Sequence, residues 1–194
     1  MSPVATMTVD DAQQRVLAAA DELFYGRGIA AVTMSDVRDR SGVSLRRLYS
    51  LYPAKKDLVA AWLSDRHDTW MSWFTASVAR HASTGTDAIL ATFDAVEEWI
   101  NSPVYRGCGF INSIAETSEI DDRHRTIIAS HKRDLINHLA ALAIRDHPKS
   151  PAWLPEAIAV ILDGAFVQCA IFNSTEPLRA AKHAAQQLLE TTKA

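Results

Sequence analysis

The chain has 194 residues, of which 48% are hydrophobic and two are cysteines. That apolar content suffices for a buried core without metals or crosslinks, and two cysteines exclude a disulfide-stapled secreted domain, so a soluble protein of the reducing cytoplasm is expected. The N-terminus lacks a signal-peptide pattern, no apolar run is expected to span a membrane, and a net charge of −3 argues against general affinity for nucleic acid.

A first amphipathic helix is predicted after Thr8, which has the capping-box spacing with Asp11. Apolar residues then recur at helical spacing as far as Phe24, and glycines at positions 26 and 28 should end the helix. Its apolar face is expected to complete a small core with Ile29, Val32, Met34, Val37, Leu48 and Tyr52.

Residues 33–58 predict two short helices joined by a tight turn. Thr33 with Asp36 should cap the first helix, Gly42 should end it, and Ser44 should cap the second. Two helices joined in this way form a helix-turn-helix, whose second helix fits the major groove of DNA. This stretch holds six basic and three acidic residues, so the positive charge is local to it.

The second helix and its flanks carry the side chains that we expect to contact DNA. Arg46 and Arg47 can fork onto guanine or phosphate, and Ser44 with the first-turn amides can hold a phosphate. The full set is Thr33, Ser44, Leu45, Arg46, Arg47, Tyr49, Ser50 and Lys55. On spacing alone, a helical hairpin with a solvated basic face is an equal alternative.

The run Gly42-Val43-Ser44, then Leu48-Tyr49, Tyr52, Lys55 and Leu58, resembles the signature of the tetracycline-repressor (TetR) family of bacterial regulators. The resemblance implies a DNA-binding regulator in which Lys55 contacts phosphate. Residues 106–110, Arg-Gly-Cys-Gly-Phe, are also similar to a segment of many members. Arg46 and Arg47 stand where many members carry small residues or threonine, and Leu51 stands where a tyrosine or histidine commonly contacts phosphate, so the operator sequence does not follow.

The remaining chain predicts helices only, over residues 57–81, 87–101, 105–118, 121–146, 154–172 and 176–191. We therefore expect an all-α protein of about nine helices. A three-helix domain with the helix-turn-helix should occupy residues 1–56, and a larger helical domain for ligand binding and dimerisation should occupy residues 57–194.

The family resemblance implies a pocket for a largely apolar small molecule in the second domain. Its expected lining is Trp70, Phe74, Phe93, Phe110, Ile114, Ile128, His131 and Phe166. Occupancy should tilt the helix that begins near Asp57 and release palindromic operator DNA. A homodimer through residues 154–194 is expected, because their apolar content exceeds what one core face needs.

An enzyme and a ligand-independent DNA-binding protein are the two other classes of function. No nucleophile elbow, Walker loop, dinucleotide glycine pattern or metal-ligand pair is present, so neither an enzyme nor a cofactor is expected. His124, His131 and His138 recur every seven residues, too far apart along a helix to share an ion. A ligand-independent DNA-binding protein is the alternative, and Cys108 with Cys169 would form a redox switch only if the fold brought them together.

Overall fold

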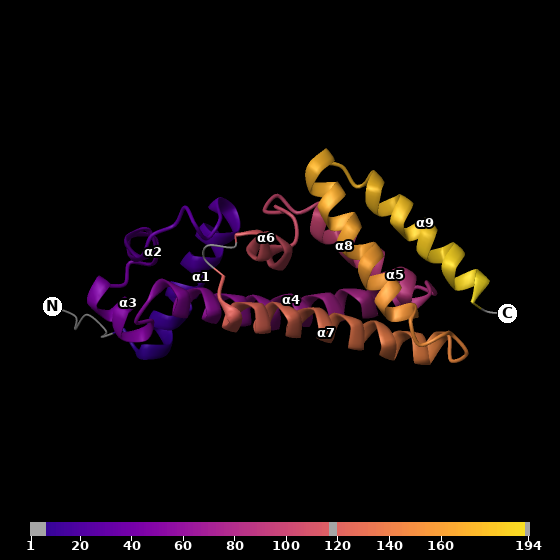
Figure 1. The fold of residues 1–194 in the computed structure, drawn as a ribbon, viewed down its shortest axis with the longest axis horizontal. Coiled ribbons are helices and arrows are strands. Elements are labelled where there is room, and N and C mark those ends of the chain that lie inside the picture. Colours follow the sequence, from indigo (N-terminus) through magenta and orange to yellow (C-terminus); the bar gives the residue numbers. More distant parts are fainter. Residues whose placement is uncertain (1–6, 117–119, 193–194) are drawn as a thin grey trace. The chain divides into compact units, whose positions relative to one another are not determined.

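The computed structural model describes residues 7–116 and 120–192, and every regular element in that part of the chain is an α-helix. Figure 1 shows these helices in chain order. They are α1 (Val9–Arg27), α2 (Met34–Ser41), α3 (Leu45–Leu51), α4 (Lys55–Ala82), α5 (Ala88–Ile100), α6 (Gly109–Ala115), α7 (Asp122–Asp146), α8 (Leu154–Phe172) and α9 (Glu176–Thr191). The predicted all-α class is confirmed for the described residues, as is the number of helices.

The helices form two compact units, which are described separately. Unit 1 holds residues 1–66 and 112–128, and unit 2 holds residues 67–111 and 129–194. The helices α4, α6 and α7 contribute residues to both units. The domain boundary expected between residues 56 and 57 stays a prediction.

In unit 1, α1 and α2 begin at the capping boxes that their sequences predict. The Thr8 hydroxyl accepts a hydrogen bond from the Asp11 N–H at 3.0 Å, and the Asp11 carboxylate accepts one from the Thr8 N–H at 3.3 Å. Thr33 and Asp36 repeat this arrangement at the start of α2. These bonds satisfy amides that a helix start leaves without a backbone partner, so both predicted starts are confirmed.

The core of unit 1 lies among α1, α2, α3 and the first part of α4. The apolar residues expected in this core are all buried: Ile29, Val32, Met34, Val37, Leu48 and Tyr52. Leu48 is completely buried at the centre of α3, whereas its neighbour Tyr49 is 45% exposed. One face of α3 is therefore fixed in the core and the other lies at the surface.

A buried arginine fixes the first half of α4 against α1. Arg66 Nη1 donates to Asp21 Oδ1 at 2.5 Å, and its guanidinium lies over the Tyr25 ring, 3.8 Å from the ring centre. The same Asp21 oxygen accepts a hydrogen bond from Trp62 Nε1 at 2.7 Å. Because Arg66 is only 9% exposed, its charge depends on this partner, and the group holds the two helices in register.

The residue that follows α6 reaches back to the loop between α1 and α2. Glu116 Oε1 accepts from the Ile29 N–H at 2.9 Å, and Oε2 accepts from the Ala30 N–H at 2.6 Å. Gly28 lies beside this carboxylate with a φ of 85°, and a Cβ there would stand 3.2 Å from Oε1. We call these two hydrogen bonds the Glu116 clasp, which joins segments of unit 1 that lie far apart in the sequence.

The core of unit 2 lies among α5, α8, α9 and the parts of α4 and α7 in that unit. Its buried side chains include Phe74, Phe93, Leu139, Ile158 and Phe166. In this unit α9 packs against both α8 and α5, and Figure 1 shows the short turn that joins α8 to α9. An ion pair between Lys182 and Asp94 also ties α9 to α5.

By length and composition, α8 could cross a membrane. It contains an 18-residue window with a mean hydropathy of 1.6, although Glu156 and Asp163 interrupt its apolar residues. Within unit 2, 44% of the window is buried, and core helices of folded domains meet the same criteria. The face of α8 outside the core carries Val160, Gly164, Val167 and Ile171, which recur about once per turn.

The loop before α6 is longer than the sequence predicts. The helix expected over residues 105–118 begins at Gly109, because Gly107 takes a φ of 90° that an α-helix does not contain. The described part of this helix ends at Ala115, and positions 117 and 118 of the prediction lie outside the described residues. The displaced start leaves residues 105–108 as loop.

Candidate functional site

The turn between α2 and α3 is built by Gly42 and Ser44. Gly42 takes a left-handed φ of 69°, and its N–H closes α2 by donating to the Arg38 carbonyl at 3.0 Å. Ser44 then starts α3, because its hydroxyl accepts from the Arg47 N–H at 3.4 Å. This is the geometry of a helix-turn-helix, in which the outer face of the second helix is presented to the major groove.

The two arginines of α3 differ in their surroundings. Arg46 is exposed, as is Tyr49, so both lie on the outer face of the helix. Arg47 Nη2 instead donates to the Thr8 carbonyl at 2.6 Å, which ties α3 to the start of α1. A hollow of about 510 Å³ beside these groups is lined by Val9, Ser44, Arg46, Arg47, Ser50 and Leu51.

Thr33 is engaged by its own capping partner. Its N–H and its hydroxyl both donate to Asp36 Oδ2, at 2.7 and 2.6 Å. The hydroxyl contact is the main cause that holds the pKa of Asp36 below its ordinary value, so this carboxylate is charged at neutral pH. A phosphate bound at Thr33 would therefore compete with Asp36 for the same donors.

The other expected DNA contacts surround α3. Ser50 is exposed, and its hydroxyl donates to the Arg47 carbonyl at 2.7 Å, while Leu45 is half-buried in the first turn. Lys55 is the first residue of α4, so that helix begins two residues before its predicted start at Asp57. This places Lys55 at the positive end of the α4 dipole, which favours an anion such as phosphate.

Four of the residues expected to line an effector pocket form one aromatic stack in unit 2. The Trp70 and Phe74 rings are stacked 4.6 Å apart, and the Phe110 and His131 rings are stacked 3.6 Å apart. Trp70 meets His131 edge to face, with ring centres 5.3 Å apart, which joins the two pairs. At 3.6 Å the Phe110 and His131 rings are in contact, so a ligand could enter between them only by separating them.

The other four expected lining residues are placed differently. Phe93 and Phe166 are buried in the hydrophobic core of unit 2. Ile114 and Ile128 belong to unit 1, where Ile128 is buried and Ile114 is half-buried. The eight-residue lining stays a prediction, and the rings in mutual contact are its best-defined part.

Sequence reasoning missed a histidine beside this stack. The Nδ1 atoms of His67 and His131 lie 3.1 Å apart, so one ring must carry the shared proton and the other must accept it. Asp134 Oδ2 is 3.6 Å from the other nitrogen of His67. The available signal was the position of His67, one turn before Trp70 on the same helix.

Comparison with known proteins supports the interpretation of the N-terminal segment as a helix-turn-helix region. The model of the tetR family of bacterial regulatory proteins matches residues 16–62, which span most of α1, all of α2 and α3, and the start of α4. The transcriptional regulator TtgR of Pseudomonas putida is 26% identical over 137 residues. That match spans 64% of this chain and 64% of TtgR, somewhat less than two thirds of either.

Solved structures share the fold of nearly the whole chain. A TetR-family transcriptional regulator from Streptomyces coelicolor, SCO4454, superposes with a TM-score of 0.80 at 21% identity, covering 95% of this chain and 97% of that one. The multidrug binding protein EbrR, solved in complex with malachite green, gives a TM-score of 0.68 at 19% identity, with 91% and 96% covered. At these identities the likeness concerns the fold.

Proposed function

Because this chain belongs to the tetR family of bacterial regulatory proteins, we propose that it regulates transcription by binding operator DNA through α2 and α3. The observation that carries this function is the geometry of α3, which is capped by Ser44, anchored by the buried Leu48 and exposed at Arg46 and Tyr49. A rigid helix with a basic outer face is what major-groove recognition requires.

Arg46 and Tyr49 are the proposed base-reading residues. Arg46 is exposed at the start of α3, where recognition helices contact base edges. Ser44 and Lys55 are proposed to hold phosphates, since each lies at a helix N-terminus. Thr33 is proposed as a further phosphate contact, and Arg47 as a contact that forms when its bond to Thr8 opens.

Selection of bound sequences from a random DNA pool tests this assignment. Arg46→Ala should relax preference at one base pair by about 1–3 kcal/mol, whereas Lys55→Ala should weaken all sequences alike and flatten the salt dependence. Arg145→Ala is the matched control, because Arg145 is an exposed arginine of unit 2 whose partner is the adjacent Asp146. Equal binding by all three variants would remove α3 from DNA recognition.

A homodimer is proposed through the face of α8 outside the core. Val160 is 72% exposed and Ile171 is 68% exposed, and a Cβ added at Gly164 would meet nothing within 4 Å. A partner helix could approach closely at such a glycine, and symmetric pairing lets two recognition helices read a palindrome. Several apolar residues of the 154–194 segment, namely Ile158, Leu162, Ala165 and Leu189, fill the core of unit 2 and are not part of this surface.

Sedimentation of the Val160→Asp variant tests the dimer. The unmodified chain should sediment as a dimer at micromolar concentration, and a charge on this apolar face should give a folded monomer. Ala180→Asp on the exposed part of α9 shows whether that helix shares the interface. A dimer that persists in the Val160→Asp variant would place the interface elsewhere.

Release of DNA by an apolar small molecule completes the proposed function. The support is the stack of Trp70, Phe74, Phe110 and His131, together with the dye-bound structure of EbrR. Binding should separate Phe110 from His131, and a coupling of roughly 1–3 kcal/mol must act equally on DNA and on ligand. Without that coupling, the alternative function is a ligand-independent DNA-binding protein.

Tryptophan fluorescence tests the coupling with malachite green as the probe. The dye should quench the fluorescence of the unmodified chain, and the Trp70→Phe variant identifies the part of the signal that comes from the stack. Selected operator DNA should weaken dye binding by about tenfold, the factor equivalent to 1.4 kcal/mol. Equal dye affinity with and without DNA, or no dye binding at all, would favour the ligand-independent alternative.

A further inference from the structure

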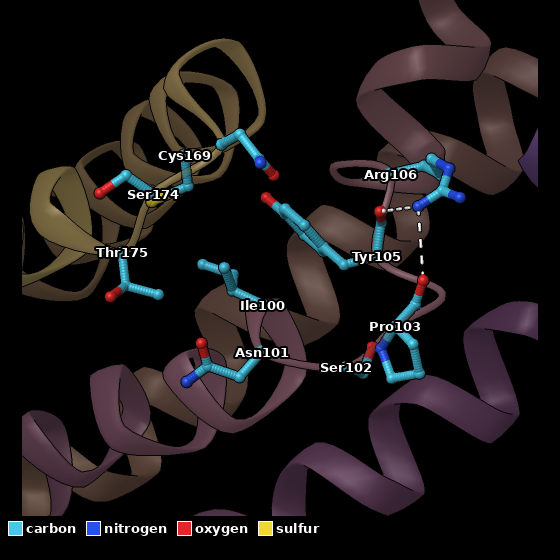
Figure 2. Close-up of a pocket in the computed structure, with 10 residues that line it drawn as sticks. Ile100, Asn101, Ser102, Pro103, Tyr105, Arg106, Cys169, Ser174 and Thr175 are labelled. Carbon is cyan, nitrogen blue, oxygen red and sulfur yellow. Dashed lines mark hydrogen bonds between the residues drawn. The ribbon is translucent and has the colours of Figure 1, made fainter.

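A second hollow lies within unit 2, and none of its lining residues belongs to the aromatic stack. It has a volume of about 540 Å³ and is lined by the end of α5, the loop before α6 and the turn between α8 and α9. We call it the turn pocket, and Figure 2 shows its lining residues. They are Ile100, Asn101, Ser102, Pro103, Tyr105, Arg106, Cys169, Asn173, Ser174 and Thr175.

The walls of the turn pocket are held in place by local hydrogen bonds. Asn173 ends α8 in the left-handed conformation, with a φ of 47°, and its N–H donates to the Cys169 carbonyl. On the opposite side, the Tyr105 hydroxyl donates to the Phe166 carbonyl at 2.9 Å. Arg106 Nη1 donates to the Tyr105 carbonyl at 2.7 Å, as Figure 2 shows. The hollow therefore exists before any ligand arrives.

The lining consists mostly of hydrogen-bonding groups. The Ser102 hydroxyl oxygen is buried, and no residue that the structure describes gives it a hydrogen-bond partner. Because this oxygen has almost no accessible surface, a ligand in the hollow would reach it only after the Ser102 side chain turned. The Ser174 hydroxyl accepts from the Glu176 N–H at 3.2 Å, which leaves its proton to be donated in another direction.

The charges of the lining favour an anion. Arg106 is the one charged side chain among the ten lining residues, and Thr175 is the N-cap residue of the 16-residue α9, at the positive end of its dipole. Burial raises the pKa of the Cys169 thiol above its ordinary value, so this group is neutral at pH 7. Glu176 opposes an anion from the first turn of α9, but it is not among the lining residues.

The volume of the hollow sets the size of the ligand. At about 540 Å³ it falls in the range of small-molecule pockets and far exceeds a bare ion. Ile100, Pro103 and the Tyr105 ring offer apolar contacts for the body of such a molecule. We propose that the turn pocket binds a small carboxylic acid, whose carboxylate accepts from the hydroxyl and amide donors of the lining within the field of Arg106.

Matched acid and amide pairs test the charge that the pocket selects. Acetate with acetamide and benzoate with benzamide are titrated into the full-length ¹⁵N-labelled chain, and the backbone amide signals are followed. Benzoate should shift the signals of Ser102, Arg106 and Ser174 saturably, with a Kd on the order of 1 mM. Benzamide should bind about tenfold more weakly, because the charge-assisted hydrogen bonds are lost.

Two variants separate the pocket from nonspecific binding. Arg106→Gln changes an exposed side chain and should weaken benzoate about tenfold. Arg145→Gln, on α7 outside the lining, should leave the affinity unchanged. The absence of saturable shifts at these three residues, equal affinities for benzoate and benzamide, or unchanged binding in the Arg106→Gln variant would each overturn the proposed site.

Discussion

The Glu116 clasp predicts a local and measurable stabilisation of the loop between α1 and α2. The Glu116→Ala variant removes both carboxylate oxygens that accept from Ile29 and Ala30, at 2.9 and 2.6 Å. A hydrogen bond to a charged group contributes about 1.5–3 kcal/mol when buried. The bond to Ile29 is part-buried and the bond to Ala30 is exposed, so we discount the pair to about 2 kcal/mol in total.

Native-state hydrogen exchange measures this quantity at the two amides themselves. A loss of about 2 kcal/mol corresponds to a decrease of roughly 25-fold in their protection, since 1.4 kcal/mol is a factor of ten. Glu116→Gln keeps one oxygen acceptor without the charge, so the protection of these amides should lie between that of the unmodified chain and that of Glu116→Ala. Gly28→Ala should also weaken the clasp, because its Cβ would approach Glu116 Oε1 to 3.2 Å and its φ is 85°.

The matched control is Glu22→Ala, which removes an exposed glutamate of α1 that pairs with Arg40. Its effect on Ile29 and Ala30 should be small, because exposed ion pairs contribute little. If the two amides exchange at the same rate in the Glu116→Ala and Glu22→Ala variants, the clasp does not hold the loop.

Three further predictions concern stability. Asp21→Ala removes the partner of the buried Arg66 and of Trp62 Nε1. It should lower the free energy of unfolding by about 2–3 kcal/mol, after allowance for the partial exposure of Asp21. A denaturant titration that shows a loss below about 0.5 kcal/mol, the size of an ordinary surface substitution, would contradict this prediction. Phe93→Ala empties a site that is 1% exposed and should cost about 3–5 kcal/mol in the same assay, a loss that Val160→Ala on the open face of α8 should not approach. Burial lowers the pKa of His138 below its ordinary 6.5, so the unfolded chain takes up a proton first as the pH falls through that value. The free energy of unfolding should therefore decrease below about pH 6.5. His138→Leu should reduce this dependence of the unfolding free energy on pH between pH 7 and 5, and an unchanged dependence would assign it to other groups.

Local patterns in the sequence determined the helices and most of their ends. The capping boxes at Thr8 and Thr33 and the left-handed Gly42 act within one or two turns of chain, so their consequences can be predicted without knowing the fold. The main error in helix placement concerns residues 105–108. The spacing of polar and apolar residues allows a helix there, but the positive φ of Gly107 excludes one.

The candidate DNA-binding residues could also be predicted from the sequence, because recognition by a helix-turn-helix depends on positions along one short helix. The partners of those residues were not. Arg47 donates to Thr8 across 39 positions, and this contact separates its role from that of Arg46, its neighbour in the sequence. Nothing in the pattern of α3 distinguishes two adjacent arginines until the start of α1 is placed beside one of them.

Contacts between distant segments were decided by the tertiary structure alone. Glu116 meets the amides of Ile29 and Ala30, Arg66 meets Asp21, and His67 meets His131, in each case across more than 40 positions. The turn pocket has the same origin, since two loops about 70 residues apart supply its walls. Helix periodicity fixes which face of a helix is apolar, but the choice of neighbour depends on how all the faces pack together, and that information is not contained in any one segment.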